Sequence, residues 1–178
     1  MTEYHQGPHT FHLGSGECVL LTGKDGCRQL LRELSRRPDC AMVSLCRPVL
    51  WGRSARAEGA LTLLGLQPGR PWKELGKVER IKFCMAAALG RKVEVLLLDH
   101  PTRDLDPEER QQLFSALKDL ARKTGMTILF TSHDLPDALA IVTRVLAFTP
   151  AGTFLESTQK NRPEVLRAAF PILKNAGL

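Results

Sequence analysis

Three features that often reveal where a protein works are missing from this sequence of 178 residues. No apolar run approaches the ~18 residues that a membrane-spanning helix needs. No charged and then apolar leader of the secretory kind opens the chain. The five cysteines form no CxxC pair and are odd in number, which is typical of reduced thiols rather than a disulfide framework. These absences favour a cytoplasmic globular protein.

The charge is unevenly distributed along the chain. Residues 1–92 hold 15 Lys and Arg against 8 Asp and Glu, whereas residues 93–178 hold 10 against 11. A basic half favours an anionic ligand such as a nucleotide, a nucleic acid or a lipid surface. It is equally consistent with a solvated surface that is rich in arginine. No block of five like charges occurs, so composition alone does not choose between these readings.

Strand and helix signals alternate along most of the chain. Apolar runs predict strands at residues 11–13, 18–22, 40–45, 93–98, 126–130 and 143–148, and helical periodicity predicts helices at 26–37, 76–89, 106–124, 134–141 and 163–174. This alternation predicts a mostly parallel sheet covered on both faces. The length suits a single domain over residues 1–178, with a poorly ordered start at 1–10 and an irregular region at 46–75.

Polar residues follow the ends of two of these strands. Asp99 and His100 come directly after the apolar run 93–98, and His133 comes shortly after the run 126–130. The carboxyl ends of neighbouring parallel strands are where open α/β sheets bind ligands. The helix between these strands begins at Asp106, which is predicted to cap it in a capping box with Glu109.

A third strand end has the composition of an anion site. The run 18–22 leads into a turn that contains two glycines and then into a helix. Backbone N–H groups of such a turn and the positive end of the helix both point at a bound anion. The candidate phosphate-binding residues are Gly23, Lys24, Asp25, Gly26, Cys27 and Arg28.

The order of these motifs resembles the ATP-binding cassette (ABC) transporter ATPases. Residues 96–102, LLLDHPT, resemble the family's LLLDEPT, and 103–106, RDLD, resemble its D-loop SxLD. Residues 132–144 match the family's switch histidine and the helix after it, and residues 65–80 resemble the region of its LSGGQ motif. The resemblance implies an α/β fold, a P-loop NTPase-like three-layer sandwich with a mostly parallel sheet and a reduced helical subdomain.

The resemblance also implies a set of site residues. ATP and Mg²⁺ would be the cofactors, with Asp99 holding Mg²⁺ through water and His133 contacting the γ-phosphate. His100 stands where the family has its catalytic glutamate. Arg103, Asp106 and Gly76 would line an interface with a second ATPase subunit. Tyr4 and Phe11 are the aromatic candidates for stacking on the base, although Phe11 also suits a core position.

Several residues depart from the family's pattern. Without a gap, the phosphate-loop lysine falls on Gln29 and the Mg²⁺-binding hydroxyl falls on Leu30. Lys24 or Arg28 could partly replace the lost charge. His100 could act as a general base near neutral pH, or it could be a tolerated replacement at an inactive site. Of the LSGGQ motif, which falls on residues 73–77, only Gly76 remains.

These observations leave three functions open. The first is an ABC transporter-like ATP-binding subunit with weak or no hydrolysis, coupled to a membrane permease. The second is a structural or regulatory subunit without turnover, forming a homodimer or a heterodimer with another ABC ATPase. Both suit a cytoplasmic protein that lies peripherally on the inner face of a membrane. The third is a nucleic-acid-associated ABC protein, which no aromatic-and-basic stripe or recognition helix supports.

Overall fold

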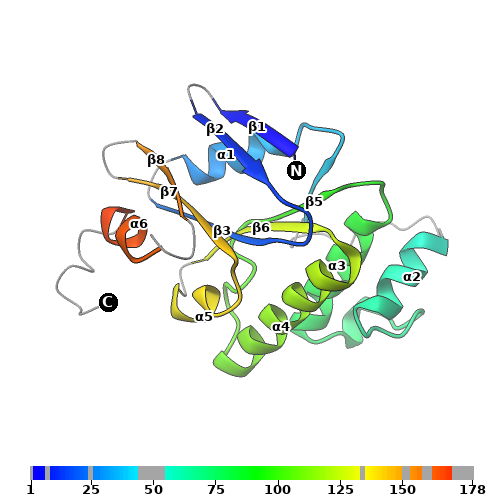
Figure 1. Cartoon of the computed structure of the whole chain (residues 1–178). Helices are drawn as coiled ribbons and strands as arrows, with labels where there is room; N and C mark the ends of the chain where they lie inside the picture. Colours follow the sequence, from blue (N-terminus) through cyan, green and yellow to red (C-terminus); the bar gives the residue numbers. More distant parts are fainter. Residues whose placement is uncertain are drawn as a thin grey trace.

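A computed structural model of the chain describes residues 2–6, 9–23, 26–43, 55–132, 135–149, 153–157 and 162–169 (Figure 1). The strands are β1 (Thr2–Gln6), β2 (His9–Leu13), β3 (Cys18–Gly23), β4 (Cys40–Met42), β5 (Val95–Leu98), β6 (Thr127–Thr131), β7 (Arg144–Phe148) and β8 (Phe154–Glu156). The helices are α1 (Cys27–Leu34), α2 (Ala55–Leu63), α3 (Lys77–Leu89), α4 (Pro107–Thr124), α5 (Leu135–Leu139) and α6 (Arg162–Ala169), with a short 3-10 helix η1 (Trp72–Glu74).

The main sheet is mostly parallel, as the alternation of strands and helices predicts. Its order is β4-β5-β6-β3-β7-β8. The first five strands run parallel to one another, and β8 pairs antiparallel with β7 at one edge. A separate two-stranded hairpin is formed by β1 and β2. The chain therefore has the three-layer α/β architecture that was expected.

The two faces of the sheet are buried against different layers. Val19 and Leu21 of β3 belong to the same core as Leu31 of α1 and the β1–β2 hairpin. Leu20 of β3 points the opposite way and joins a larger core that includes Leu117 of α4. Figure 1 shows α1 and the hairpin on one side of the sheet and α2, α3 and α4 on the other. Alternate residues of one strand thus fix both covering layers.

The start of the chain differs from the expectation of poor order. Residues 2–6 pair with 9–13, and the side chain of Tyr4 is 1% exposed. Its hydroxyl donates a hydrogen bond to Asp39 Oδ2 at 3.0 Å, while Arg37 Nε donates to Asp39 Oδ1 at 3.1 Å. Burial alone would raise the pKa of Asp39, but these two hydrogen bonds outweigh it and lower the pKa. Phe11 stacks on Tyr4 and is fully buried, so neither aromatic ring is available to a nucleotide base.

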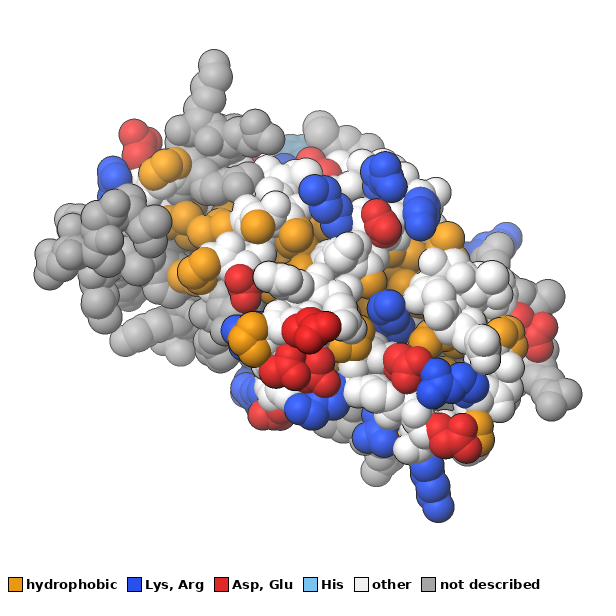
Figure 2. Space-filling view, turned by 90° about the horizontal axis from the view of Figure 1, so that it is seen from below, with side chains coloured by type: hydrophobic (Ala, Val, Ile, Leu, Met, Phe, Trp, Pro, Cys, Tyr) orange, Lys and Arg blue, Asp and Glu red, His pale blue; other side chains and the backbone are white. Residues whose placement is uncertain are grey.

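The helical layer is ordered by its caps and carries mixed charge on its outer face. Asp106 Oδ1 accepts from the Glu109 backbone N–H at 2.8 Å, and Glu109 Oε2 accepts from the Asp106 N–H at 3.0 Å, which is the predicted capping box. Gly125 ends α4 in the left-handed conformation. Figure 2 shows acidic and basic side chains intermixed on this face, with apolar side chains between them. In the parts of the chain that are described, no helix is long and apolar enough to cross a bilayer.

Candidate functional site

Three neighbouring central strands bring the candidate residues together at their carboxyl ends. β5, β6 and β3 lie side by side and run in the same direction, so their carboxyl ends meet. Asp99 follows β5, Thr131 ends β6 and Gly23 ends β3. The helix α1 begins just after Gly23 and brings Arg28 to the same place, with Arg28 Nε 3.6 Å from Asp99 Oδ2. This is the strand-end position at which open α/β sheets bind ligands.

Asp99 is held by its neighbours from both adjacent elements. The Thr131 hydroxyl donates to Asp99 Oδ1 at 3.0 Å and accepts from the His100 backbone N–H at 2.7 Å. Asp99 is therefore fixed on one side by a buried hydroxyl and faces the guanidinium of Arg28 on the other. A carboxylate that is oriented in this way can pair with a cation at the carboxyl ends of the strands.

The glycine-containing turn after β3 approaches β7 very closely. Gly23 has φ 113°, and a Cβ built on it would lie 2.1 Å from the backbone oxygen of Phe148. Gly26 precedes the first turn of α1 with φ 105° and supplies no side-chain cap. Lys24 and Asp25 lie outside the described residues. The turn therefore keeps both glycines for backbone reasons, and the helix start after it carries no acidic residue.

Cys27 opens α1 on its buried side. Its thiol donates to the Gly23 carbonyl oxygen at 3.7 Å, and burial raises the pKa of this thiol to about 11. At neutral pH the group is therefore a neutral thiol rather than a thiolate. It adds no negative charge to a turn that the sequence assigns to anion binding.

His100 occupies an unusual backbone conformation. Its φ is 47°, in the left-handed region where histidine is enriched among non-glycine residues. Its side chain is 19% exposed, and its Nε2 lies 3.8 Å from Asp99 Oδ1. The imidazole therefore lies next to the carboxylate of the preceding residue. His133, the other predicted catalytic histidine, lies outside the described residues.

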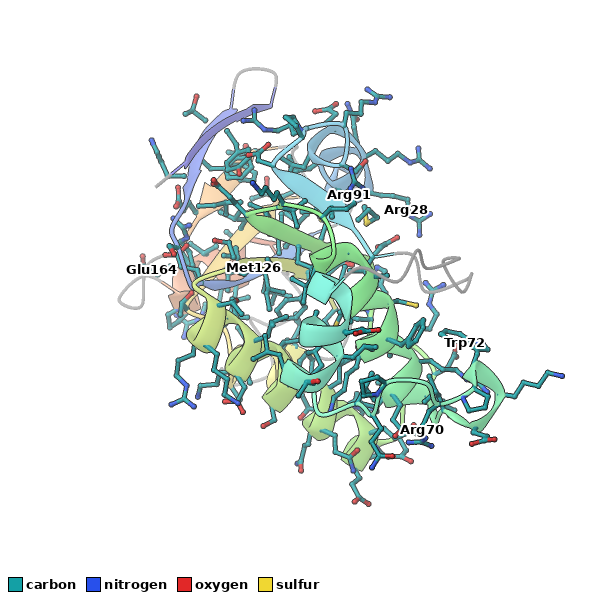
Figure 3. The ribbon with its side chains drawn as sticks, turned by 90° about the vertical axis from the view of Figure 1, so that its right-hand side faces the viewer. Arg28, Arg70, Trp72, Arg91, Met126 and Glu164 are labelled. Carbon is teal, nitrogen blue, oxygen red and sulfur yellow. The ribbon has the colours of Figure 1, made fainter. Side chains whose placement is uncertain are left out.

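A cleft of about 800 Å³ opens beside these strand ends. Its basic lining residues are Arg28 and Arg32 from α1, Lys77 and Arg80 from α3, and Arg103 from the turn after β5. Asp99 and Asp104 are its only carboxylates among the described residues that line it. Figure 3 shows Arg28 on the same side of the molecule as Trp72, another lining residue. The volume suits a nucleotide-sized ligand, and the excess of basic groups suits an anionic one.

The three residues expected at a subunit interface lie near one another. Gly76 caps α3 and donates its backbone N–H to Glu79 Oε2 at 2.9 Å, and this bond lowers the pKa of Glu79. Lys77 Nζ donates to the Asp104 carbonyl oxygen at 2.7 Å, which connects the start of α3 to the turn that carries Arg103 and leads to Asp106. Their role in an interface stays a prediction.

Two residues of this site were missed by reading the sequence. Thr131 holds Asp99, and the sequence shows that each of them directly follows an apolar run. The structure pairs Leu98 with Phe130, so the residues that follow them are neighbours. Arg32 lines the cleft one helical turn after Arg28, a spacing that puts both side chains on one face of α1. Thr131 could have been identified as a polar residue that directly follows a predicted strand, and Arg32 as a basic residue four positions after Arg28 on a predicted helix.

Replacing Thr131 with valine should destabilise the fold by about 1–3 kcal/mol, because a partly buried backbone N–H and a carboxylate oxygen lose their shared hydroxyl. Urea unfolding would measure the change in unfolding free energy. Thr62→Val is the control, because the Thr62 hydroxyl donates to the Glu58 carbonyl oxygen within an exposed part of α2. Equal stability of the two variants would contradict the bridging role of Thr131.

Comparison with known proteins gives a consistent result. No protein-family description matches the chain. It is 30% identical over 105 residues to an energy-coupling factor transporter ATP-binding protein, EcfA2, of Clostridioides difficile, which covers 59% of this chain and 35% of that protein. It is 38% identical over 96 residues to a cobalt import ATP-binding protein, CbiO, of Rhodobacter capsulatus, which covers 53% of this chain and 34% of that protein. The chain thus spans about a third of the length of these curated relatives.

Solved structures show the same fold. A metal-chelate type ABC transporter in an inward-facing conformation superposes with a TM-score of 0.75 at 23% identity, over 91% of this chain and 80% of that one. CbiO1 from Clostridium perfringens, part of the ABC transporter complex cbiONQ, superposes with a TM-score of 0.71 at 16% identity, over 98% and 95%. The fold is that of P-loop NTPases. In sequence the chain is similar to ATP-binding proteins of transporters, and in fold it is similar to chains of ABC transporter complexes.

Proposed function

We propose that this chain is the ATP-binding subunit of an ABC-type transporter with weak or no ATP hydrolysis. The observation that supports the proposal is that features suited to binding a nucleotide are present while a residue needed for hydrolysis is replaced. The glycine turn, Asp99 and a basic cleft are in place. Leu30, at the position of the family's Mg²⁺-binding hydroxyl, is instead 1% exposed and packed in the core.

The chemistry expected at this site supports binding more than turnover. Hydrolysis in the family needs a general base beside Asp99 and a lysine that neutralises the β- and γ-phosphates. Here His100 and Gln29 stand at those positions. A general base contributes roughly 10²–10⁴-fold where it operates, so its loss alone would make turnover slow. The subunit would act with a second ABC ATPase and a membrane permease, peripherally at the inner face of the membrane.

A subunit that has no turnover at all is the second candidate. The hydrogen bond from Lys77 to the Asp104 carbonyl oxygen supports this candidate, because it holds together the surface next to the expected interface. The LSGGQ residues that would act on a partner's nucleotide are replaced there, apart from Gly76. Such a chain would pair with a complete ABC ATPase and regulate it. A nucleic-acid partner gains no support from the helical face in Figure 2, where charges of both signs alternate.

Calorimetric titration with ATP and a hydrolysis assay test the proposal together. We expect saturable binding, and phosphate release at least about 100-fold slower than that of a complete ABC ATPase measured in parallel. His100→Glu should recover less than about tenfold, because the phosphate-loop lysine is still missing. No heat and no thermal shift at millimolar ATP would refute binding, and full turnover by the native chain would refute the loss of hydrolysis.

A further inference from the structure

The residues around Asp99 do not fit Mg²⁺ in the way the family uses it. Mg²⁺ prefers octahedral oxygen ligands and keeps several waters. The position of the second protein oxygen is taken by Leu30, whose side chain is buried in the core on one face of the sheet. Across the described ranges, no group of three or more His, Cys, Asp and Glu side chains could hold a metal ion.

A cation of the protein already stands beside Asp99. Arg28 Nε is 3.6 Å from Asp99 Oδ2, and its side chain is 62% exposed toward the cleft. A guanidinium has five N–H donors in a planar fork, so contact with one carboxylate oxygen leaves donors for a phosphate. Arg28 sits in the first turn of α1, where the backbone N–H groups and the helix dipole also favour an anion.

More positive charge lines the cleft beyond this pair. Arg32 and Arg103 form no ion pair with any residue that the structure describes, and both line the cleft with Arg28. Arg80 lies over the ring of Trp72 at 5.6 Å, which holds its guanidinium at the wall. Tyr4 and Phe11 are buried within the hairpin and offer no ring to a base. The ring of Trp72, which does line the cleft, already packs against Arg80 and Phe83.

We propose that the cleft binds a polyphosphate chain directly through Arg28, without a divalent metal and without reading a base. Arg28 supplies beside Asp99 the positive charge that Mg²⁺ supplies in other members of the family. Arg32 and Arg103 extend this charge along the chain of phosphates. The inference rests on the proposed function and narrows its ligand to the triphosphate group itself.

Titration in EDTA tests the inference separately from the proposed function. ATP and inorganic triphosphate should both bind in EDTA, with affinities within about tenfold of ATP with Mg²⁺. Binding of ATP that needs Mg²⁺ would overturn the inference and leave the proposed function standing. Binding of ATP but not of triphosphate would overturn it too, because the base would then be read. No binding under any condition would overturn both.

Substitutions distinguish an arginine-based site from a Mg²⁺ site, because Asp99→Asn should change the affinity in opposite directions at the two. Arg28→Gln should weaken triphosphate binding in EDTA about tenfold or more, since a hydrogen bond to a charged group is lost. Arg122→Gln is the control, because Arg122 is an exposed arginine of α4 whose partner among the described residues is Asp119. Asp99→Asn should tighten binding in EDTA by removing a like charge, whereas at a Mg²⁺ site it would weaken binding of Mg-ATP. Loss of binding in Asp99→Asn with unchanged binding in Arg28→Gln would refute the role of Arg28.

Discussion

Gly23→Ala is expected to lower the melting temperature by about 10 °C or more, one of the two largest effects that we expect from single substitutions. The added Cβ would lie 2.1 Å from the Phe148 backbone oxygen and 2.8 Å from its nitrogen. Gly23 and Phe148 are paired in the β3–β7 ladder, so neither backbone can withdraw without breaking sheet hydrogen bonds. A φ of 113° adds strain that alanine does not relieve.

The size of this effect follows from the steric contact rather than from the lost flexibility of glycine. Strain at a positive φ alone costs on the order of 1–3 kcal/mol, and displacing paired backbone adds to it. A total of about 4 kcal/mol would be exceptional for one substitution and large beside a typical stability of roughly 5–15 kcal/mol. For a domain of this length, each kcal/mol corresponds to about 2–4 °C in melting temperature.

The control for Gly23→Ala is Gly59→Ala. Gly59 lies in α2, and a Cβ on it meets nothing within 4 Å. Alanine should stabilise a helix interior by roughly 0.5–1 kcal/mol, so this variant should melt slightly higher than the native chain. Thermal unfolding followed by circular dichroism compares the two. A melting temperature of Gly23→Ala within 2–4 °C of the native value, the change that about 1 kcal/mol produces, would contradict the close approach of β3 and β7.

The same contact explains why the turn after β3 keeps its first glycine. By the resemblance to the ABC ATPases this glycine would belong to a loop that wraps around phosphate, and that role would explain a glycine here. Here the constraint comes from β7, which passes directly against the end of β3. The turn is therefore held by the sheet even if the bound ligand differs from Mg-ATP.

Sequence reasoning predicted the elements whose signals are local. The apolar strand Val95–Leu98 and the capped helix Pro107–Thr124 lie close to where the pattern predicted them. Periodicity and a capping box depend on residues within one or two turns of each other. For the same reason the carboxyl-end location of Asp99 was correctly predicted, because a buried strand run that ends at a carboxylate is visible in one short stretch.

Long-range contacts were beyond such reasoning. Tyr4 bonds to Asp39, and the polar alternation around Tyr4 resembles a loose terminus until that partner is known. The approach of Arg28 to Asp99 depends on β5, β6 and β3 being adjacent, and no local pattern encodes the order of parallel strands. The pairing of Arg28 with Asp99 therefore follows from the strand order, although the sequence marks each residue separately as a site candidate.

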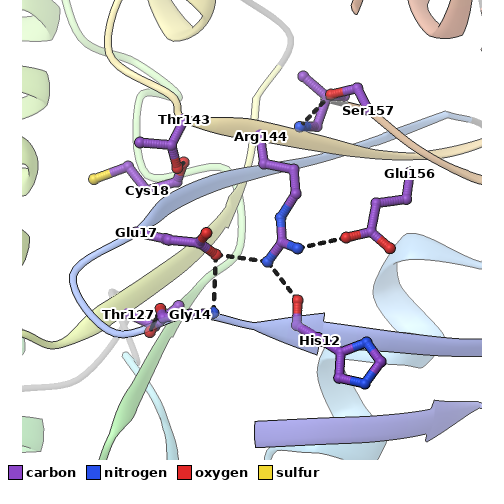
Figure 4. Close-up of polar contacts among 10 residues, drawn as sticks. His12, Gly14, Glu17, Cys18, Thr127, Thr143, Arg144, Glu156 and Ser157 are labelled. Atoms are coloured by element: carbon purple, nitrogen blue, oxygen red, sulfur yellow. Dashed lines mark hydrogen bonds and ion pairs between the residues drawn. The ribbon is translucent and has the colours of Figure 1, made fainter. Parts of the chain in front are cut away.

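Arg144→Met is expected to destabilise the chain by about 2–3 kcal/mol, the second large effect. Arg144 donates to Glu17 Oε2 at 2.5 Å, to Glu156 and to the His12 carbonyl oxygen, while its side chain is only 15% exposed (Figure 4). It therefore joins β2, the turn before β3, and β8 through one guanidinium. Methionine keeps much of the volume but leaves two carboxylates without their cation.

The expected loss is smaller than the roughly 3–5 kcal/mol that breaking a fully buried pair costs, because water can reach both carboxylates. Glu17 and Glu156 are 28% and 35% exposed. Arg122→Met is the matched control, since its exposed pair with Asp119 should contribute less than about 1 kcal/mol. Urea unfolding of both variants measures the difference.

Charge and packing can be separated at Arg144 by a second substitution. Adding Glu156→Gln to Arg144→Met should recover part of the loss if unpaired charge causes it, and none if lost packing does. Because Arg144 begins β7 and the glycine-containing turn follows the far end of β3, the folded fraction should keep the triphosphate binding proposed above. A loss no larger than that of Arg122→Met would mean that the network in Figure 4 adds little to stability.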